Sequence, residues 1–169
     1  QLRTFDVTSK DAAAYGYEKP EAMKNQVTVA DALYVLHKTM YGDAFDENPS
    51  KYLNVGSNGW IYAMLENTTG NFGYYVNNKY PVDENGQGTV ANTTALKNGD
   101  TLSLYVLADT SGYTDEHIYF ENVPEEICAG KEFAVTVKGL SMMTPVENEK
   151  ECTVELKNLD TAETSEFVT

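Results

Sequence analysis

Cations and histidines are scarce in this chain of 169 residues. It holds 12 lysines and arginines against 26 aspartates and glutamates, for a formal net charge of −14. A surface of this sign repels polyanions, so nucleic acids and anionic membrane surfaces are excluded as partners. The two histidines, His37 and His117, have no neighbour at metal-ligand spacing and lie in no motif typical of a hydrolase or a zinc enzyme. We expect His37 at a solvated helix position and His117 in a linker.

Long apolar runs are also absent. No stretch approaches the ~20 apolar residues that a membrane helix needs, and nothing at the start resembles a signal peptide. We therefore expect no membrane insertion in this fragment. The chain begins at Gln1 without Met, which indicates a mature or excised fragment. Its high Tyr, Asn and Thr content favours an extracellular or cell-wall-attached location.

Cysteine is nearly absent, and both examples, Cys128 and Cys152, lie in the last third of the chain. In an extracellular setting they could form a disulfide, which would stabilise the fold by ~3–4 kcal/mol. Two buried free thiols are the alternative. Two cysteines without nearby histidines do not make a zinc site, so we expect no metal there.

The composition changes near Ser111-Gly112. Residues 1–112 carry a net charge of −5 and ten of the twelve tyrosines, whereas residues 113–169 carry −9. A shift of charge and aromatic content at one point is typical of a domain boundary. The sequence therefore predicts two domains, 1–111 and 112–169.

The most informative stretch runs from Gly73 to Tyr105. Phe72 to Val76 is aromatic and β-branched, which favours a strand, and Asn77-Asn78 supplies residues that tolerate a tight reversal. Asn98-Gly99-Asp100 predicts a second turn. Alternating residues from Leu102 to Val106 then predict a strand with one buried face.

One helix and a first strand are predicted upstream. Apolar residues recur at helical spacing after Thr28, and Asp31 three residues on completes a pattern like a capping box. Gly42 is the expected end of this helix. The apolar positions that we expect to face a sheet are Val29, Leu33, Leu36 and Met40. Partial alternation within Leu2–Thr8 predicts the first strand.

These elements and their motifs resemble the DUF4430 family. The residues that carry the resemblance are Trp60, Tyr74, Val76, Asn77, Tyr80, Pro81, Leu96, Gly99 and Asp100. The family commonly has Asn-Gly where this chain has Asn77-Asn78. The resemblance implies a β-grasp-like domain related to the C-terminal domain of transcobalamin and intrinsic factor. It also implies a secreted or surface protein of a Gram-positive bacterium.

The second segment resembles bacterial immunoglobulin-like modules. The matching positions are Pro124, Gly130, Phe133, Val135 and Val137. Such a sandwich needs about 100 residues, so this segment is either an incomplete sandwich or a smaller sheet. The expected fold class is thus α+β: a β-grasp-like domain with one main helix on a mixed sheet, followed by an all-β Ig-like sandwich.

A group of aromatic residues suggests a ligand-binding site: Trp60, Tyr62, Tyr74, Tyr75 and Tyr80. The residues chosen as the candidate site are Trp60, Tyr75, Asn77 and Tyr80. Along a strand Tyr74 and Tyr75 point to opposite faces, so at least one should stand on an outer face. Exposed Tyr and Trp bind carbohydrates, peptides and cofactor rings well because they combine large area with a polar tip. The alternative interpretation places Trp60 and Tyr74 in the core.

Acidic clusters are weaker candidates. Asp43 to Asn48 and Asp83 to Asn85 are rich in the oxygen ligands that calcium prefers, but neither has EF-hand spacing. We expect solvated loops, no metal and no cofactor. Lys131 or Lys138 could form an isopeptide bond of the kind found in pilin-like Ig domains.

The expected function is that of a non-enzymatic secreted or cell-surface module, which acts as a binding unit or a spacer in a larger bacterial adhesin-like protein. Its ligand would be an unknown protein, glycan or small molecule. One alternative is a corrinoid-type small-ligand domain, although the transcobalamin family needs a large helical partner domain that this chain lacks. The other is a carboxylate-dependent hydrolase.

Overall fold

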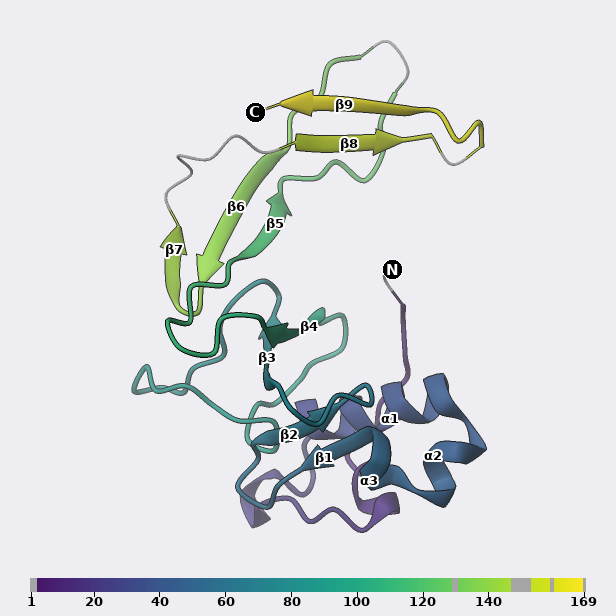
Figure 1. Cartoon of the computed structure of the whole chain (residues 1–169), viewed down its shortest axis with the longest axis vertical. Coiled ribbons are helices and arrows are strands. Elements are labelled where there is room, and N and C mark those ends of the chain that lie inside the picture. Colours follow the sequence, from purple (N-terminus) through teal and green to yellow (C-terminus); the bar gives the residue numbers. More distant parts are fainter. Residues whose placement is uncertain (1–2, 129–130, 147–152, 159, 169) are drawn as a thin grey trace. The chain divides into compact units, whose positions relative to one another are not determined.

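The computed structural model describes residues 3–128, 131–146, 153–158 and 160–168. It divides into two compact units, Gln1–Asp115 and Glu116–Thr169 (Figure 1). The division falls close to the boundary predicted at Ser111-Gly112. Helices and small antiparallel sheets are both present, so the chain is of the α+β class.

The first unit contains all the α-helices of the described residues. Two short 3₁₀ helices, Ala13–Tyr15 and Glu21–Met23, precede them. The helices and strands that follow are α1 (Val29–Tyr41), α2 (Asp43–Glu47), α3 (Pro49–Tyr52), β1 (Leu53–Val55), β2 (Ile61–Met64), β3 (Asn71–Val76) and β4 (Leu102–Leu107). The described part of the predicted first strand, residues 3–8, forms no strand, so that prediction is wrong. Its apolar residues do not alternate regularly, and the chain turns at once where the Thr8 N–H bonds the Asp11 carboxylate.

Helix α1 begins and ends as predicted. The backbone N–H and the hydroxyl of Thr28 both donate to Asp31 Oδ2, at 2.9 and 2.8 Å, within the predicted capping box. Gly42 ends the helix with a φ of 58°, a conformation that suits glycine. Val29 and Leu33 are buried as expected, but Met40 is exposed. His37 takes the buried position in the last turns instead.

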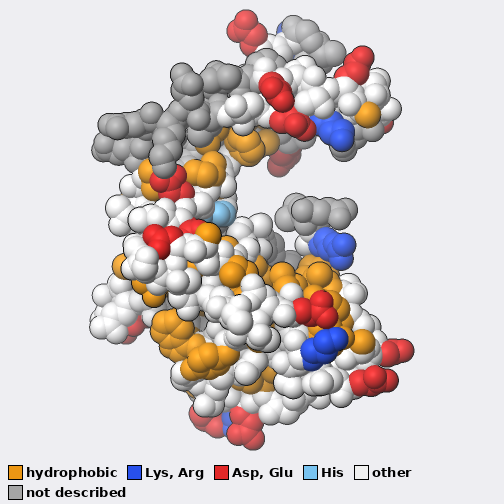
Figure 2. Space-filling model, in the orientation of Figure 1, with side chains coloured by type: hydrophobic (Ala, Val, Ile, Leu, Met, Phe, Trp, Pro, Cys, Tyr) orange, Lys and Arg blue, Asp and Glu red, His pale blue; other side chains and the backbone are white. Residues whose placement is uncertain are grey.

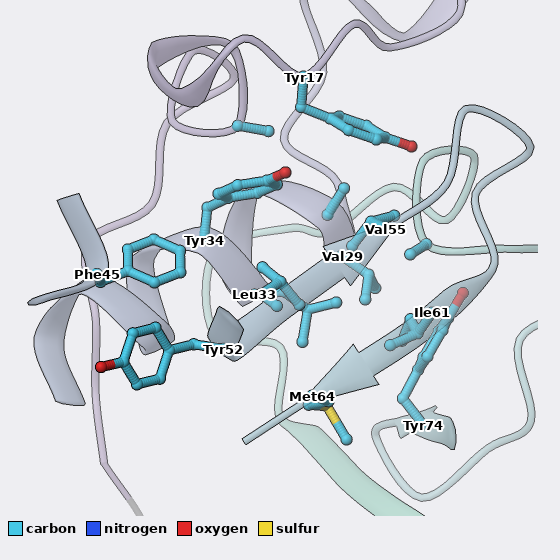
Figure 3. Packing of buried hydrophobic residues seen from close by; sticks show 14 residues of the cluster. Tyr17, Val29, Leu33, Tyr34, Phe45, Tyr52, Val55, Ile61, Met64 and Tyr74 are labelled. Carbon is cyan, nitrogen blue, oxygen red and sulfur yellow. The ribbon is translucent and has the colours of Figure 1, made fainter. Parts of the chain in front are cut away.

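The core of the first unit lies between α1 and the β1–β2 hairpin (Figure 3). Phe45 of α2 lies between Tyr34 and Tyr52, with ring centroids 6.1 and 6.3 Å away. Leu53, Val55, Ile61 and Met64 line the hairpin side of this core, and Tyr74 of β3 joins it. Burying a large apolar side chain contributes about 1.5–3 kcal/mol, so this aromatic cluster fixes where α2 and α3 sit.

Two antiparallel pairs, β1–β2 and β3–β4, make up the sheets of the first unit. In the second pair the register runs from Asn71↔Leu107 to Val76↔Leu102. The predicted turn is confirmed: Asn77 and Asn78 have φ of 52° and 57°, and Val76 and Lys79 exchange backbone hydrogen bonds. The single mixed sheet of the expected β-grasp arrangement is not confirmed.

Within the described residues of the second unit, all the regular secondary structure consists of strands. They are β5 (His117–Glu121), β6 (Thr136–Ser141), β7 (Thr144–Val146), β8 (Thr153–Lys157) and β9 (Thr164–Val168). Hydrogen bonds join them as β5-β6-β7 and β8-β9, and an Ig-like sandwich is not confirmed. Phe133 and Val135, two positions of the Ig-like resemblance, precede β6, which begins at Thr136 opposite Glu121 at the end of β5.

Apolar side chains of the second unit remain largely at the surface. All the buried hydrophobic side chains of the described residues lie in the first unit, whereas Ile118 and Phe120 of β5 are 49% and 50% exposed. Figure 2 shows such hydrophobic patches on both units. Cys128 is exposed, and Cys152 lies outside the described residues, so their disulfide stays a prediction. Lys131 is exposed, while Lys138 forms a surface ion pair with Glu121 at 3.0 Å.

Candidate functional site

Two aromatic side chains of the first unit project into solvent beside β2. Trp60 is 61% exposed and Tyr62 is 52% exposed, while Ile61 between them is buried in the core. The alternation of a strand therefore directs both rings outward. Tyr62 is also the extra residue of a β-bulge, because Asn54 pairs with Ala63 while Val55 pairs with Ile61. Bulges commonly redirect side chains at functional surfaces.

A tight turn holds the chain immediately before these rings. The Gly59 N–H donates to Gly56 O at 2.8 Å, and the Gly56 N–H donates to Trp60 O at 2.8 Å. Gly59 has a φ of 79°, in the left-handed region that disfavours any residue with a Cβ atom. We call residues 56–62 the aromatic turn.

Three hydrogen bonds fasten the aromatic turn to the domain beneath it. The Tyr17 hydroxyl donates to Gly56 O at 2.9 Å, and the Asn92 amide donates to Ser57 O at 3.2 Å. The Ala91 N–H donates to Gly59 O at 3.0 Å. Because Asn92 and Ala91 are themselves buried, these bonds hold the turn against a packed layer.

Asn58 fixes the positions of the two aromatic residues. Its Oδ1 accepts the Trp60 N–H at 3.1 Å, and its Nδ2 donates to the Tyr62 hydroxyl at 2.9 Å. The Tyr62 ring also lies against Gly56, where an added Cβ would stand 2.5 Å from a ring carbon. The Trp60 backbone and the Tyr62 ring are thus held in place, and the aromatic turn presents one indole, one phenol and one amide.

The segment that carries this surface contributes no charge. Residues 52–65 contain no Asp, Glu, Lys, Arg or His, in a chain of which 22% is charged. The flanking residues, Lys51 and Glu66, lie 3.6 Å apart as a surface ion pair. The turn can therefore bind through stacking and neutral hydrogen bonds, but it offers no ionic partner of its own.

The other predicted site residues do not join Trp60 on this surface. Tyr75 is only 3% exposed and packs beside Tyr80 and Tyr105, with centroids 6.3 and 5.2 Å away. Tyr74 is buried too, so the expectation that one of the two faces outward is wrong. Other rings cover the outer face of β3, which the strand pattern alone did not reveal.

Asn77 and Tyr80 are also engaged within the domain. The Asn77 amide donates to Asp100 Oδ1 at 2.7 Å and accepts the Thr101 N–H at 2.8 Å, so this side chain joins the β3 turn to the start of β4. Tyr80 is half-buried against Gly88. Tyr62 belonged to the predicted aromatic group but not to the four residues chosen as the site. The spacing of Trp60 and Tyr62 around Ile61, after a Gly-Ser-Asn-Gly turn, is the signal that could have placed it there.

The acidic clusters bond to neighbouring groups of the chain. Asp46 forms an ion pair with Lys38, which lowers its pKa, and accepts the Tyr15 hydroxyl at 2.8 Å. Asp83 Oδ1 accepts the N–H groups of Asn85 and Gln87 at 2.9 and 2.8 Å. Within the described ranges, no group of three or more His, Cys, Asp or Glu residues is placed to hold a metal ion.

His37 is buried, so its predicted solvated position is wrong. Its Nδ1 lies 2.7 Å from Leu33 O, and its Nε2 accepts the Leu65 N–H at 3.1 Å. This pattern fits the neutral ring protonated on Nδ1, and burial lowers its pKa. His117 lies in β5 rather than in a linker, stacked on Tyr119 at 5.6 Å.

Comparisons with protein-family models, curated proteins and solved structures found no match for this chain. The resemblance to the DUF4430 family thus stays a prediction. Among the described helices, none has both the length and the apolar character required to cross a bilayer.

Proposed function

We propose that this chain is a non-enzymatic binding module of an extracellular or cell-wall-attached protein, and that the aromatic turn is its contact surface. The observation that carries the proposal is the exposure of Trp60 and Tyr62 on a hydrogen-bonded turn. Leaving two large rings in water forgoes the burial that stabilises the fold. Such rings on a preordered turn lose little entropy when a ligand covers them, which is the property of binding hot spots.

The fold proposed for this module is a β-grasp-like domain of the DUF4430 type followed by an Ig-like spacer. Support comes from the order of α1, β3, the Asn77-Asn78 turn and β4, and from the strands of the second unit. A secreted or surface location agrees with the resemblance and with the high Tyr, Asn and Thr content.

The test is binding to a panel of immobilised oligosaccharides and unmodified peptides, followed by biolayer interferometry. We expect the wild-type chain to bind at least one class and Trp60→Ala to lose that binding. Phe120→Ala is the matched control, since Phe120 is another half-exposed aromatic residue but belongs to the second unit. Equal binding by wild type and Trp60→Ala, or no binding to any class, would refute the proposal.

A further inference from the structure

We infer that the aromatic turn binds a neutral carbohydrate chain. This inference rests on the proposed function, because it names the ligand class of the same surface. It follows from three properties of the turn: exposed ring faces, neutral hydrogen-bonding groups, and the absence of charge.

Stacking is the first property. The C–H face of a sugar ring is apolar, and it packs on the π-face of an aromatic side chain that carries negative quadrupole charge. Trp60 and Tyr62 are two residues apart near one strand, which separates their backbones by about 7 Å. Two exposed rings at this spacing can contact successive parts of one extended saccharide.

Neutral hydrogen-bonding groups are the second property. The Tyr62 hydroxyl accepts from Asn58 Nδ2, which leaves its own proton available to donate to a sugar oxygen. Asn54 of β1 is exposed and pairs with Ala63, next to Tyr62 on β2. A phenol and amides can each both donate and accept, as sugar hydroxyls do.

Charge is the third property, and it argues against charged ligands, namely anionic glycans and basic peptides. The chain carries −14, which repels sulfated and uronic-acid glycans at long range. A basic peptide would be attracted to this protein, but it would need carboxylates at the contact surface, and residues 52–65 contain none. A neutral saccharide needs no charged group at the contact surface, and the negative charge of the chain does not repel it.

The single tryptophan of the chain makes the test direct. Trp60 fluorescence can be titrated with neutral hexasaccharides of glucose, mannose and N-acetylglucosamine, because no other indole contributes. We expect one of them to shift the emission with a dissociation constant of about 1 mM or tighter. Tyr62→Ala should weaken binding about tenfold or more, and Trp60→Ala should do the same by calorimetry. Tyr80→Ala and Phe120→Ala should leave it unchanged.

Two results would overturn this inference, and they differ in what they mean for the proposed function. If unmodified peptides or sulfated glycans bind in a Trp60-dependent way and neutral hexasaccharides do not, the ligand class is wrong but the binding module stands. If neither saccharides nor peptides bind in a Trp60-dependent way, both proposals fail. Unchanged thermal unfolding of Trp60→Ala and Tyr62→Ala would show that any lost affinity is not lost folding.

Discussion

The Nε2 atom of His37 accepts a hydrogen bond from the backbone N–H of Leu65 at 3.1 Å, so a helix side chain fastens a strained turn 28 residues away. Leu65 and Glu66 connect β2 to β3 with φ of 54° and 63°, a left-handed conformation that neither residue favours. Met64 and Asn67 exchange backbone hydrogen bonds across this turn. Because Leu65 and Glu66 disfavour this conformation, the hydrogen bond to the His37 imidazole helps to stabilise the turn.

Acid should weaken this contact. Burial lowers the pKa of His37 in the folded chain below the ~6.5 of an unfolded one. As the pH falls below ~6.5 the unfolded state binds a proton that the folded state resists, so the free energy of unfolding decreases until the folded pKa is reached. Urea unfolding between about pH 7.5 and 5 should show this loss.

Two variants would show which histidine causes this pH dependence of the free energy of unfolding. His37→Gln should flatten the slope in this range, although it also lowers stability at every pH. His117→Gln is needed beside it, because burial lowers the pKa of His117 in the same direction. If His37→Gln keeps the full slope, the histidine is not its source.

The same turn offers a stabilising substitution. Glu66→Gly removes the Cβ atom that disfavours a positive φ, and we expect it to raise the free energy of unfolding by about 1 kcal/mol. Glu66→Ala is the matched control: it loses the same carboxylate and the same surface pair with Lys51, but keeps the Cβ atom. Calorimetry should give a higher melting temperature for Gly than for Ala. Equal values would mean that the backbone is not strained there.

The turn at Leu65-Glu66 also shows where sequence reasoning ends. The Asn77-Asn78 turn was predicted because its residues favour positive φ, and helix α1 because its apolar residues repeat over more than three turns. Leu-Glu carries no turn signal. Its conformation depends on His37, and nothing in the local sequence specifies that contact.

Short helices were missed for a related reason. Helices α2 and α3 have five and four residues, too few for a periodic pattern. A solvated loop was expected at Asp43 to Asn48, where α2 forms, so that expectation is wrong. Phe45 and Tyr52 fix both helices by packing into the core. The candidate site shows the same limit of local sequence. Trp60 was chosen from its residue type alone, whereas the burial of Tyr75 depends on the rings of Tyr80 and Tyr105.

A buried ion pair ties the N-terminal loops to helix α1. Lys19 Nζ donates to Asp31 Oδ2 at 2.7 Å and to the carbonyls of Ser9 and Gln26 at 2.8 and 2.7 Å. Both side chains are almost fully buried. Lys19→Met should lower the free energy of unfolding by about 3–5 kcal/mol, because it leaves a buried carboxylate without its cation.

Lys24→Met is the control for the loss of a lysine as such. Lys24 pairs with Glu21 at 2.5 Å on the surface, where solvent screens such pairs and they contribute little to stability. Denaturant titration of both variants should therefore show a large loss only for Lys19→Met. If both variants lost equally little stability, the hydrogen bonds from Thr28 and Ala12 would be enough to stabilise the buried Asp31 carboxylate without Lys19.

The two glycines of the aromatic turn should separate folding from binding. Gly59→Ala places a Cβ 2.2 Å from the buried Asn92 side chain at a φ of 79°, so we expect a loss of about 2 kcal/mol or more in stability. Gly56→Ala places a Cβ 2.5 Å from the Tyr62 ring and 2.7 Å from Asn58 Oδ1, and both of these exposed side chains can rotate away at a cost of about 1 kcal/mol or less. Saccharide binding should nevertheless weaken in Gly56→Ala, because Tyr62 leaves its fixed position. Wild-type affinity in a folded Gly56→Ala variant would mean that the placement of this ring does not matter for the ligand.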